Sequence, residues 1–448
     1  MLLTARYVLP ISSPHIENGA VLVRDGSIVE AGERAQLTAA HPGEEVRDYG
    51  LAVLLPGFVD LHTHLEFAVM RGLVNDLPYS GWKLSLLDKE QLLEPADWDQ
   101  SARLGALEAL QSGITTIADI TETGASARAV AESGLRAVVY CEVSTMKKSL
   151  IPEVLAGAEE MMAAWGEEAG PLAAIGIAPH APYSCHPELY RRTAALAAER
   201  GLRVSTHLAG SRDEYDFVKY GSSRLAVDYS DRFDRPDVAW FPTGVSPVKY
   251  LLQWGFFDVP GILAVHCVQV DDADIEVLAG RDVRVAHCPR CNAKLAMGIA
   301  PLRRMLDRGL IVGIGTDSPA SNNTMDVFDE MRIGLLLQRA TRPHDSFFEA
   351  ERFVRMATIE GAKALGIDDL VGTLEPGKRA DVVAVELSSS HQVPTRDPYG
   401  ALVHTSNQEN VLMTMVDGEV RYEGERWATM DAEEILRRAE PIRMKLRG

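Results

Sequence analysis

The sequence predicts an α/β protein with a (β/α)8 TIM barrel and a small composite β-sandwich built from both chain ends. Through the middle of the 448-residue chain, short apolar runs alternate with helical patterns, which is typical of parallel strands joined by crossover helices. Both ends are instead rich in strand patterns. We place the barrel at residues 57–368 and the β-sandwich at residues 1–56 and 369–448.

Each chain end contains a hairpin pattern. GAVLVRDGSIVEAG alternates apolar and polar residues about Asp25-Gly26, and NVLMTMVDGEVRYEG does the same about Asp417-Gly418. A further strand pattern, ADVVAVE, precedes the second hairpin. These three segments predict the composite β-sandwich.

The middle of the chain contains eight apolar runs that suit buried parallel strands. The runs are VLLPGFVDLHTH, TTIADI, RAVVYCEV, AAIGIAPH, RVSTHLA, GILAVHCV, RVAHCP and LIVGIGTDS. The helical patterns between and after them cover residues 95–112, 125–133, 151–165, 187–200, 247–256, 272–280, 301–308, 326–339 and 347–365. The connection at residues 215–245, with clustered charges and aromatic residues, is predicted to be an inserted lid.

The composition limits the class of partner. A formal net charge of −19 repels phosphate backbones and disfavours nucleic-acid binding. No stretch approaches the roughly 18 uncharged apolar residues of a membrane span, and the N-terminus is a poor signal peptide. The five cysteines are too few and too odd in number for a disulfide framework. We therefore expect a cytoplasmic protein with a small-molecule substrate and no membrane partner.

Ionisable side chains stand where the apolar runs end. They are His62, His64, His180, His207, His266, His287 and Asp317. Because TIM-barrel enzymes carry their chemistry at the C-terminal ends of the strands, we expect these side chains to share one rim.

Three of these histidines predict a metal site. His62 and His64 are two residues apart on a strand end, so they point to the same side and suit Zn²⁺ or Fe²⁺. His207 completes a three-histidine set. Asp317 is either a further ligand that accepts a proton from water or the N-cap of the next segment.

Two further histidines predict the chemistry beside the metal. His266 is positioned to steady a water or a developing oxyanion, the alternative being a core histidine. His180, between prolines, is predicted to contact substrate rather than metal. The pair Cys288 and Cys291 forms a C-x-x-C motif, but it has neither a second pair nor a thioredoxin-like context, which disfavours a zinc ribbon or redox role.

These motifs jointly resemble the amidohydrolase superfamily, in its branch of triazine hydrolases and nucleoside or nucleobase deaminases. The motifs that carry the resemblance are LPGFVDLHTHLEFAVMRGL, GIAPHAPYSC, THLA, LAVHCVQVDD, VAHCPRCNAKLAMGIAP, GIGTDSPASNNTMDVFDEMR and VGTLEPGKRADVVAVE. They run in order along the whole chain. The resemblance implies a barrel with one divalent metal ion and a β-sandwich formed by both ends, often in a homo-oligomer.

The resemblance also implies roles for individual residues. It places the metal on His62, His64, His207 and Asp317, and it makes His266 the catalytic histidine. It places His180 and Trp82 against the substrate, Trp82 by likeness to S-adenosylhomocysteine, methylthioadenosine and aminodeoxyfutalosine deaminases. Arg136 matches a residue that holds a substrate carboxylate in some of these enzymes.

One position departs from the pattern. The family has a glutamate three residues after the histidine of the fifth strand, and it moves protons in deaminases, but this chain has Gly210 there. Glu66 and Asp317 are candidate replacements, and Glu66 would share the side of His64 on a strand. The alternative makes Glu66 a partner that orients a metal histidine. Glu214 either caps the following segment or faces solvent.

We therefore predict a metal-dependent hydrolase that deaminates a purine-like nucleoside or another nitrogen heterocycle. Zinc is the first expectation for the metal and iron(II) the second. Two alternatives remain open, and the glycine at position 210 favours both. One is hydrolysis of an aryl halide or a cyclic amide, and the other is a metal-binding protein with reduced catalysis.

Overall fold

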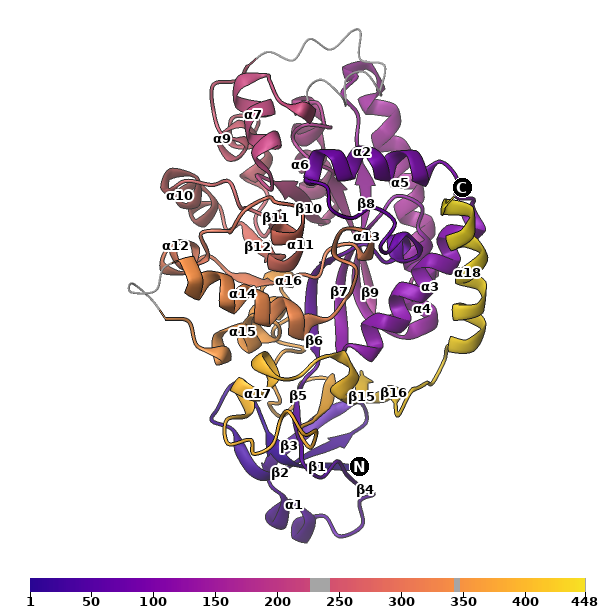
Figure 1. Ribbon diagram of the computed structural model, residues 1–448, viewed down its shortest axis with the longest axis vertical. Coiled ribbons are helices and arrows are strands. Elements are labelled where there is room, and N and C mark those ends of the chain that lie inside the picture. Colours follow the sequence, from indigo (N-terminus) through magenta and orange to yellow (C-terminus); the bar gives the residue numbers. More distant parts are fainter. Residues whose placement is uncertain (226–241, 342–346, 448) are drawn as a thin grey trace.

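A computed structural model describes residues 1–225, 242–341 and 347–447 and contains the predicted barrel (Figure 1). Eight parallel strands are hydrogen-bonded in sequence order from β6 to β13. They are β6 (Phe58–Thr63), β7 (Ile114–Thr121), β8 (Arg136–Val143), β9 (Ala173–Pro179), β10 (Arg203–Leu208), β11 (Leu263–His266), β12 (Arg284–His287) and β13 (Val312–Ile314). Most of their residues are buried, as expected of strands that are covered on both sides.

The barrel closes between its first and last strands. The backbone N–H of Asp317 donates to the carbonyl of His62 at 2.7 Å, and Thr63 forms a parallel bridge with Asp317. Two predicted metal ligands therefore form part of the seam that completes the barrel.

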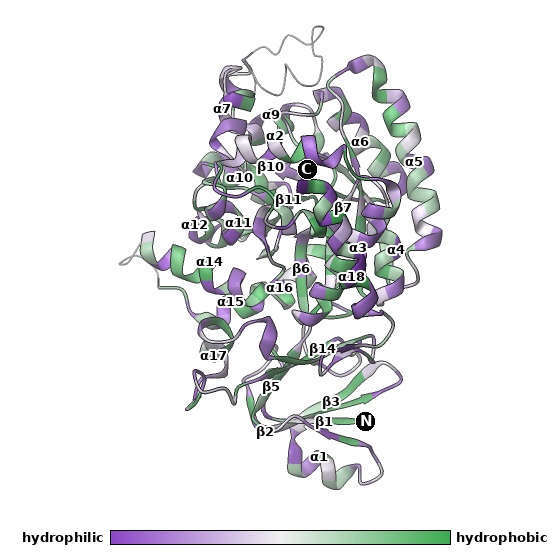
Figure 2. Cartoon of the chain, turned by 45° about the vertical axis from the view of Figure 1, so that its right-hand side comes forward, coloured by the Kyte–Doolittle hydropathy of each residue, from purple (hydrophilic) through white to green (hydrophobic). Residues whose placement is uncertain are grey.

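Helices surround the strands. The helices of the barrel layer are α3 (Pro95–Gln111), α4 (Ala125–Ser133), α5 (Ile151–Glu168), α6 (Pro187–Arg200), α7 (Arg212–Tyr220), α9 (Pro247–Gln253), α10 (Asp272–Gly280), α11 (Pro289–Lys294), α12 (Leu302–Asp307), α13 (Pro319–Asn322), α14 (Val327–Thr341), α15 (Ala350–Met356) and α16 (Ile359–Leu365). The predicted ranges of α4, α6 and α10 are confirmed. Figure 2 shows hydrophilic and hydrophobic residues mixed along α5, as in a helix with one face in water.

One sequence prediction in this layer is corrected by the structure, and another lies partly outside the described residues. The single helix predicted at 347–365 is two helices, α15 and α16, because Thr358 between them has non-helical dihedral angles (φ −130°, ψ −98°). The predicted lid begins in α7, but its residues 226–241 lie outside the described residues.

Both chain ends form one mixed sheet of nine strands below the barrel in Figure 1. Its strands are β1 (Leu2–Val8), β2 (Ile16–Arg24), β3 (Ser27–Glu33), β4 (Val46–Asp48), β5 (Ala52–Pro56), β14 (Val382–Glu386), β15 (Val411–Val416), β16 (Glu419–Glu423) and β17 (Arg426–Trp427). Strands β5 and β14 pair antiparallel and so join the two ends of the chain. The two predicted hairpins are β2–β3 and β15–β16.

The sequence analysis missed several helical segments. They are α1 (Arg34–Ala40), α2 (Tyr79–Glu90), α7, α11, α13, α17 (Pro398–His404), α18 (Ala432–Arg447) and the 3-10 turns η1 (Leu65–Met70), η2 (Lys148–Leu150), η3 (Phe256–Asp258) and η4 (Gln408–Asn410). Helix α18 lies against α3 (Figure 1), where Gln100 Nε2 donates to the carbonyl of Ile435 at 2.8 Å. The chain tail therefore covers the barrel as well as building the sheet. In the described part of the chain, no helix combines the length and the apolar character needed to cross a bilayer.

Candidate metal centre and substrate pocket

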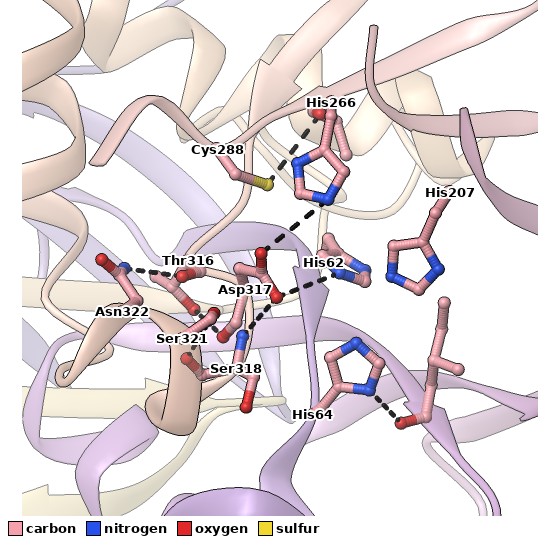
Figure 3. Close-up of polar contacts among 12 residues, drawn as sticks. His62, His64, His207, His266, Cys288, Thr316, Asp317, Ser318, Ser321 and Asn322 are labelled. Carbon is pink, nitrogen blue, oxygen red and sulfur yellow. Dashed lines mark hydrogen bonds and ion pairs between the residues drawn. The ribbon is translucent and has the colours of Figure 1, made fainter. Parts of the chain in front are cut away.

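Four predicted metal ligands come together at the C-terminal rim of the barrel (Figure 3). His62 and His64 lie at the end of β6 and His207 lies near the end of β10, and each offers a ring nitrogen within 4.8 Å of the others. Asp317 follows β13, and its Oδ1 lies 3.5 Å from His62 Nε2. Three imidazoles and one carboxylate suit a zinc or iron(II) ion.

Hydrogen bonds to the backbone orient two of these ligands. His64 Nδ1 lies 3.0 Å from the carbonyl of Ile120, and His207 Nδ1 lies 2.9 Å from the carbonyl of His180. A carbonyl accepts only, so each Nδ1 carries the proton and each Nε2 keeps a lone pair. Both imidazoles are therefore held in the tautomer that binds a cation through Nε2.

Among the described residues, His62, in contrast to His64 and His207, has no hydrogen bond that orients its ring. Within residues 1–225, 242–341 and 347–447, neither buried ring nitrogen of His62 has a hydrogen-bond partner. A buried polar atom without a partner is costly, and a cation held between His62 and its neighbours would satisfy it. The buried ring nitrogens of His62 therefore indicate that these four side chains are suited to hold a divalent ion.

The position of Asp317 distinguishes the two sequence interpretations of that residue. The N-cap of α13 is Ser318, whose Oγ accepts from the N–H of Ala320 at 3.0 Å. Asp317 is instead held with φ 61°, a left-handed conformation that is uncommon outside glycine. Its carboxylate faces His62 and His266, so it is placed for the metal site and not for the cap.

Burial and neighbouring charge set the protonation of the cluster. Burial lowers the pKa of His64 to about 3 and holds the pKa of His207 well below its ordinary value. Burial acts to raise the pKa of Asp317, but its close approach to His62 and the surrounding histidines outweigh burial and lower that pKa well below its usual range. Neutral imidazoles beside an ionised carboxylate are the forms that bind a divalent metal.

His266 lies on the same rim at the end of β11. Its backbone adopts φ 76°, and such strain in a residue other than glycine is often found at functional sites. Nδ1 contacts Asn292 Oδ1 at 3.0 Å, which orients the ring, and Nε2 lies 3.9 Å from Asp317 Oδ2. His266 therefore presents Nε2 next to the metal ligands, where substrate and water would meet.

A pocket opens directly above these residues. It measures about 550 Å³ including the part open to solvent, and its lining includes His64, His207, His266 and Asp317. Two predicted substrate contacts, His180 and Trp82, also line it. His180 Nδ1 lies 2.6 Å from Ser184 Oγ, and Trp82 Nε1 donates to the carbonyl of Ala320 at 3.3 Å.

Glu66 lines the same pocket but not in the way we expected. The chain leaves the strand after Thr63 and enters the 3-10 turn η1, so Glu66 does not share a strand face with His64. Its carboxylate accepts from Thr121 Oγ1 and Thr123 Oγ1, each at 2.6 Å, and from the N–H of Glu122 at 2.9 Å. His64 is oriented by a backbone carbonyl, so the expectation that Glu66 orients a metal histidine is corrected.

The surroundings of Gly210 show where a longer side chain would lie. A Cβ on this residue would meet Met297 Cε at 2.8 Å and His266 Cδ2 at 3.1 Å. A side chain at this position would therefore point at His266, and Met297 now fills that space. Glu214, the other nearby acid, is buried in the first turn of α7, whose N-cap is Ser211, and it accepts from the N–H groups of Ala209 (2.7 Å) and Gly210 (2.9 Å).

The structure does not bring Arg136 to the site. It is the first residue of β8, at the opposite end of that strand from the rim. Its guanidinium donates two hydrogen bonds of 3.0 Å to the carboxylate of Asp381, and it lies 3.3 Å from Asp417 Oδ1 in the end sheet. The expectation that Arg136 holds a substrate carboxylate is corrected, because a buried ion pair between barrel and sheet already engages it.

Three charged residues of the pocket were missed by sequence reasoning. Lys83 on α2, Glu122 after β7 and Glu142 near the end of β8 all line it. Both glutamates stand at strand ends, which is the signal that selected the histidines and could have selected them too. Glu142, His180 and His207 form a second group whose possible ligand atoms lie within 4.8 Å of one another.

The C-x-x-C pair has no place in this pocket lining. Cys288 and Cys291 are buried free thiols at the start of α11, and burial raises the pKa of both well above the ordinary value. A buried, protonated thiol is a poor nucleophile and a poor redox group.

The chain belongs to the amidohydrolase family, whose sequence profile matches residues 53–421. A second profile, for the bacterial imidazolonepropionase-like composite domain, matches residues 19–43 in the end sheet. The fold class predicted from the sequence is that of this family. The expected resemblance is confirmed along nearly the whole chain.

Named relatives share this architecture. A 5-methylthioadenosine/S-adenosylhomocysteine deaminase from Desulforudis audaxviator is 36% identical and covers 100% of this chain and 99% of its own. A zinc-bound adenosine deaminase structure from Xanthomonas campestris is 28% identical with a TM-score of 0.86, covering 100% of this chain and 98% of its own. A zinc complex of an atrazine chlorohydrolase from Arthrobacter aurescens, at 23% identity, 99% coverage of both chains and a TM-score of 0.83, shares the fold.

Proposed function

We propose that this protein is a metal-dependent aminohydrolase that deaminates a purine-like nucleoside. The observation that carries the proposal is the convergence of three imidazoles and one carboxylate at the floor of a pocket that holds an aromatic residue and a further histidine. The deaminase names of the relatives support the same reaction.

The metal would be held by His62, His64, His207 and Asp317, and zinc is the ion we propose because the similar adenosine deaminase structure contains it. When bound, such an ion lowers the pKa of water towards ~7 and polarises the group under attack. Hydrogen bonds to Ile120 and His180 keep two of the imidazoles oriented for this task.

The chain's own residues supply the remaining steps. His266, steadied by Asn292, presents Nε2 to the oxygen that develops charge at the reacting carbon. Asp317 lies between His266 and His62 and is positioned to accept a proton from water. Trp82 and His180 form the walls that orient the heterocycle.

A second candidate function is hydrolysis of a bond whose leaving group needs no proton, such as a carbon–chlorine bond. The specific observation is the apolar Met297 methyl group beside Gly210, in the space towards His266 where the family carries a glutamate. A chloride ion leaves without protonation, whereas an amine does not.

A substrate panel tests these functions against each other. Zinc-loaded protein is incubated with adenosine, methylthioadenosine, S-adenosylhomocysteine, a 6-chloropurine riboside and a cyclic amide, and the ammonia, chloride and carboxylate products are measured. We expect ammonia from the nucleosides. Chloride without ammonia would favour the second function, and ligand binding with no product would identify a protein that has kept its ligands but not its catalysis.

A further inference from the structure

Three acids considered for the role of the missing glutamate are already engaged. Glu66 accepts hydrogen bonds from two threonine hydroxyls and a backbone N–H, and Glu214 accepts from two backbone N–H groups behind the pocket. Asp317 belongs to the metal cluster. None of these three carboxylates is placed as a free proton donor to a departing amine.

A different pair of carboxyl groups meets this need. Glu142, near the end of β8, is partly buried in the pocket and lies within 4.8 Å of ring nitrogens of His180 and His207. Glu122, after β7, is exposed and also lines the pocket. The two side chains lie close enough for Glu122 to raise the pKa of Glu142. A neighbouring carboxylate disfavours the charged form of a buried carboxyl group, so Glu142 is placed to hold a proton.

We propose that Glu142 donates the proton to the leaving amine, and that Glu122 carries protons between Glu142 and the solvent. This inference rests on the proposed deaminase function and deepens it. It assigns the proton-handling role, which the family's fifth-strand glutamate performs elsewhere, to side chains of the second and third strands.

The proton balance of the step closes without a further reactant. The oxygen of water forms the new C–O bond, Glu142 protonates the exocyclic nitrogen, the C–N bond breaks and ammonia leaves. Asp317 accepts the two protons of water in turn: it passes the first to the ring nitrogen and the second to the solvent. Glu122 takes up a proton from the solvent and restores the carboxyl group of Glu142, so that no net proton is gained or lost.

The surroundings keep Glu142 protonated near neutral pH. Burial, and then the negative charge of Glu122, raise its pKa well above the ordinary value of a glutamate, while Lys83 acts in the opposite direction. The other titratable groups that line this part of the pocket are Glu66, Glu90 and His180. A general acid must hold its proton at the working pH, and this environment favours that state.

Leaving-group dependence tests the inference. In the zinc-loaded protein, kcat and KM are measured for adenosine and for 6-chloropurine riboside, with wild type, Glu142→Gln and Glu122→Gln. We expect Glu142→Gln to lower kcat for adenosine by about 100-fold or more, because general acids contribute roughly 10²–10⁴-fold. The kcat for the chloride substrate should change by less than about 10-fold in the same variant. Glu122→Gln should also lower kcat for adenosine more than kcat for 6-chloropurine riboside, but by a smaller factor than Glu142→Gln.

Two further measurements separate this role from a structural one. The decline of kcat with rising pH, which reports deprotonation of the acid, should be lost in Glu142→Gln. Metal content and the circular dichroism spectrum should equal those of wild type. The matched control is Glu153→Gln, an exposed carboxylate on α5 that lines a surface hollow together with Glu122 and Glu142, and it should change neither substrate's kcat.

Several outcomes would overturn the inference. Equal losses of kcat for both substrates would make Glu142 a general structural residue. A change confined to KM would make it a contact for substrate hydroxyls, and loss of metal would make it a metal ligand. If Glu142→Gln does not fold, the test rests on Glu122→Gln. An unchanged ratio of kcat for adenosine to kcat for 6-chloropurine riboside in that variant would contradict proton transfer through Glu122. Wild type that releases no ammonia contradicts the proposed function itself, whereas an active, unaffected Glu142→Gln contradicts the proton donor alone.

Discussion

Two sectors of the barrel rim handle charge in different ways. In the metal sector, formed by β6, β10 and the segment after β13, backbone carbonyls orient two of the imidazoles and the backbone also closes the barrel. In the acid sector, formed by the ends of β7 and β8, Glu122 and Glu142 face the pocket and contact each other. The comparison teaches that the metal site is fixed by the fold itself, whereas the proton route depends on individual side chains.

The largest expected effect lies in the metal sector. His207→Ala should lower the zinc affinity by at least about 100-fold and abolish turnover, because it removes a ligand outright. Metal content by mass spectrometry after dialysis against a weak chelator measures this. His180→Asn is the matched control, because it keeps the backbone carbonyl that orients His207. Full zinc retention in His207→Ala would break the proposed ligand set.

The next largest effect is a loss of stability without a change in substrate binding, and it concerns Arg136 at the end of the barrel opposite the rim. Arg136→Met should destabilise the fold by about 3–5 kcal/mol, because it leaves the buried Asp381 carboxylate without its partner. The KM of the active enzyme should not change. Urea unfolding measures the first quantity and steady-state kinetics the second. Arg128→Met, which breaks an exposed ion pair with Asp99, should cost no more than about 1 kcal/mol.

A smaller effect concerns the position of the missing glutamate. Gly210→Glu should destabilise the protein by about 1–3 kcal/mol, because its side chain overlaps the methyl group of Met297. Adding Met297→Ala should recover most of this loss. Gly157→Glu, where a Cβ meets nothing within 4 Å, is the control and should be close to neutral. Equal unfolding midpoints for Gly210→Glu and wild type would contradict the packing described for this position.

The last expected effect, similar in size to that of Gly210→Glu, is a pH dependence. Burial raises the pKa of Glu214 from 4.5 to about 7, so the folded state binds more protons than the unfolded state between these pH values. Its contribution to stability is therefore fully present below about pH 4.5 and is lost as the pH rises through about 7. Relative to Glu214→Gln, wild type should lose about 1–3 kcal/mol of unfolding free energy between pH 5 and pH 8. A difference that is constant across this range would show that Glu214 does not titrate there.

The same strand shows what sequence reasoning could and could not reach. The pattern RAVVYCEV correctly predicts β8, but the family resemblance places Arg136, which begins the strand, at the site and does not single out Glu142 near the end of the strand. Only the C-terminal end of a barrel strand reaches the rim. The side chains proposed as metal ligands can be selected from the sequence because each stands at or just after such an end.

Other features depend on local geometry that the hydrophobic pattern does not encode. The chain bends into η1 after Thr63, which turns Glu66 towards Thr121 at the end of β7 and Thr123 just after it. Helix α2 was missed because its apolar residues Trp82, Leu84 and Leu86 follow a spacing of two, which is not the helical period. Its position above the pocket nevertheless brings Trp82 and Lys83 to the site.

An anomalous-diffraction measurement on zinc-loaded crystals tests the central claim most directly. The account predicts one zinc peak bounded by His62, His64, His207 and Asp317, with Zn–N distances of about 2.0–2.1 Å. Glu142 and His180 should lie outside this coordination sphere. A peak held instead by Glu142, His180 and His207, the competing group of ligand atoms, would contradict both the metal site and the proton route.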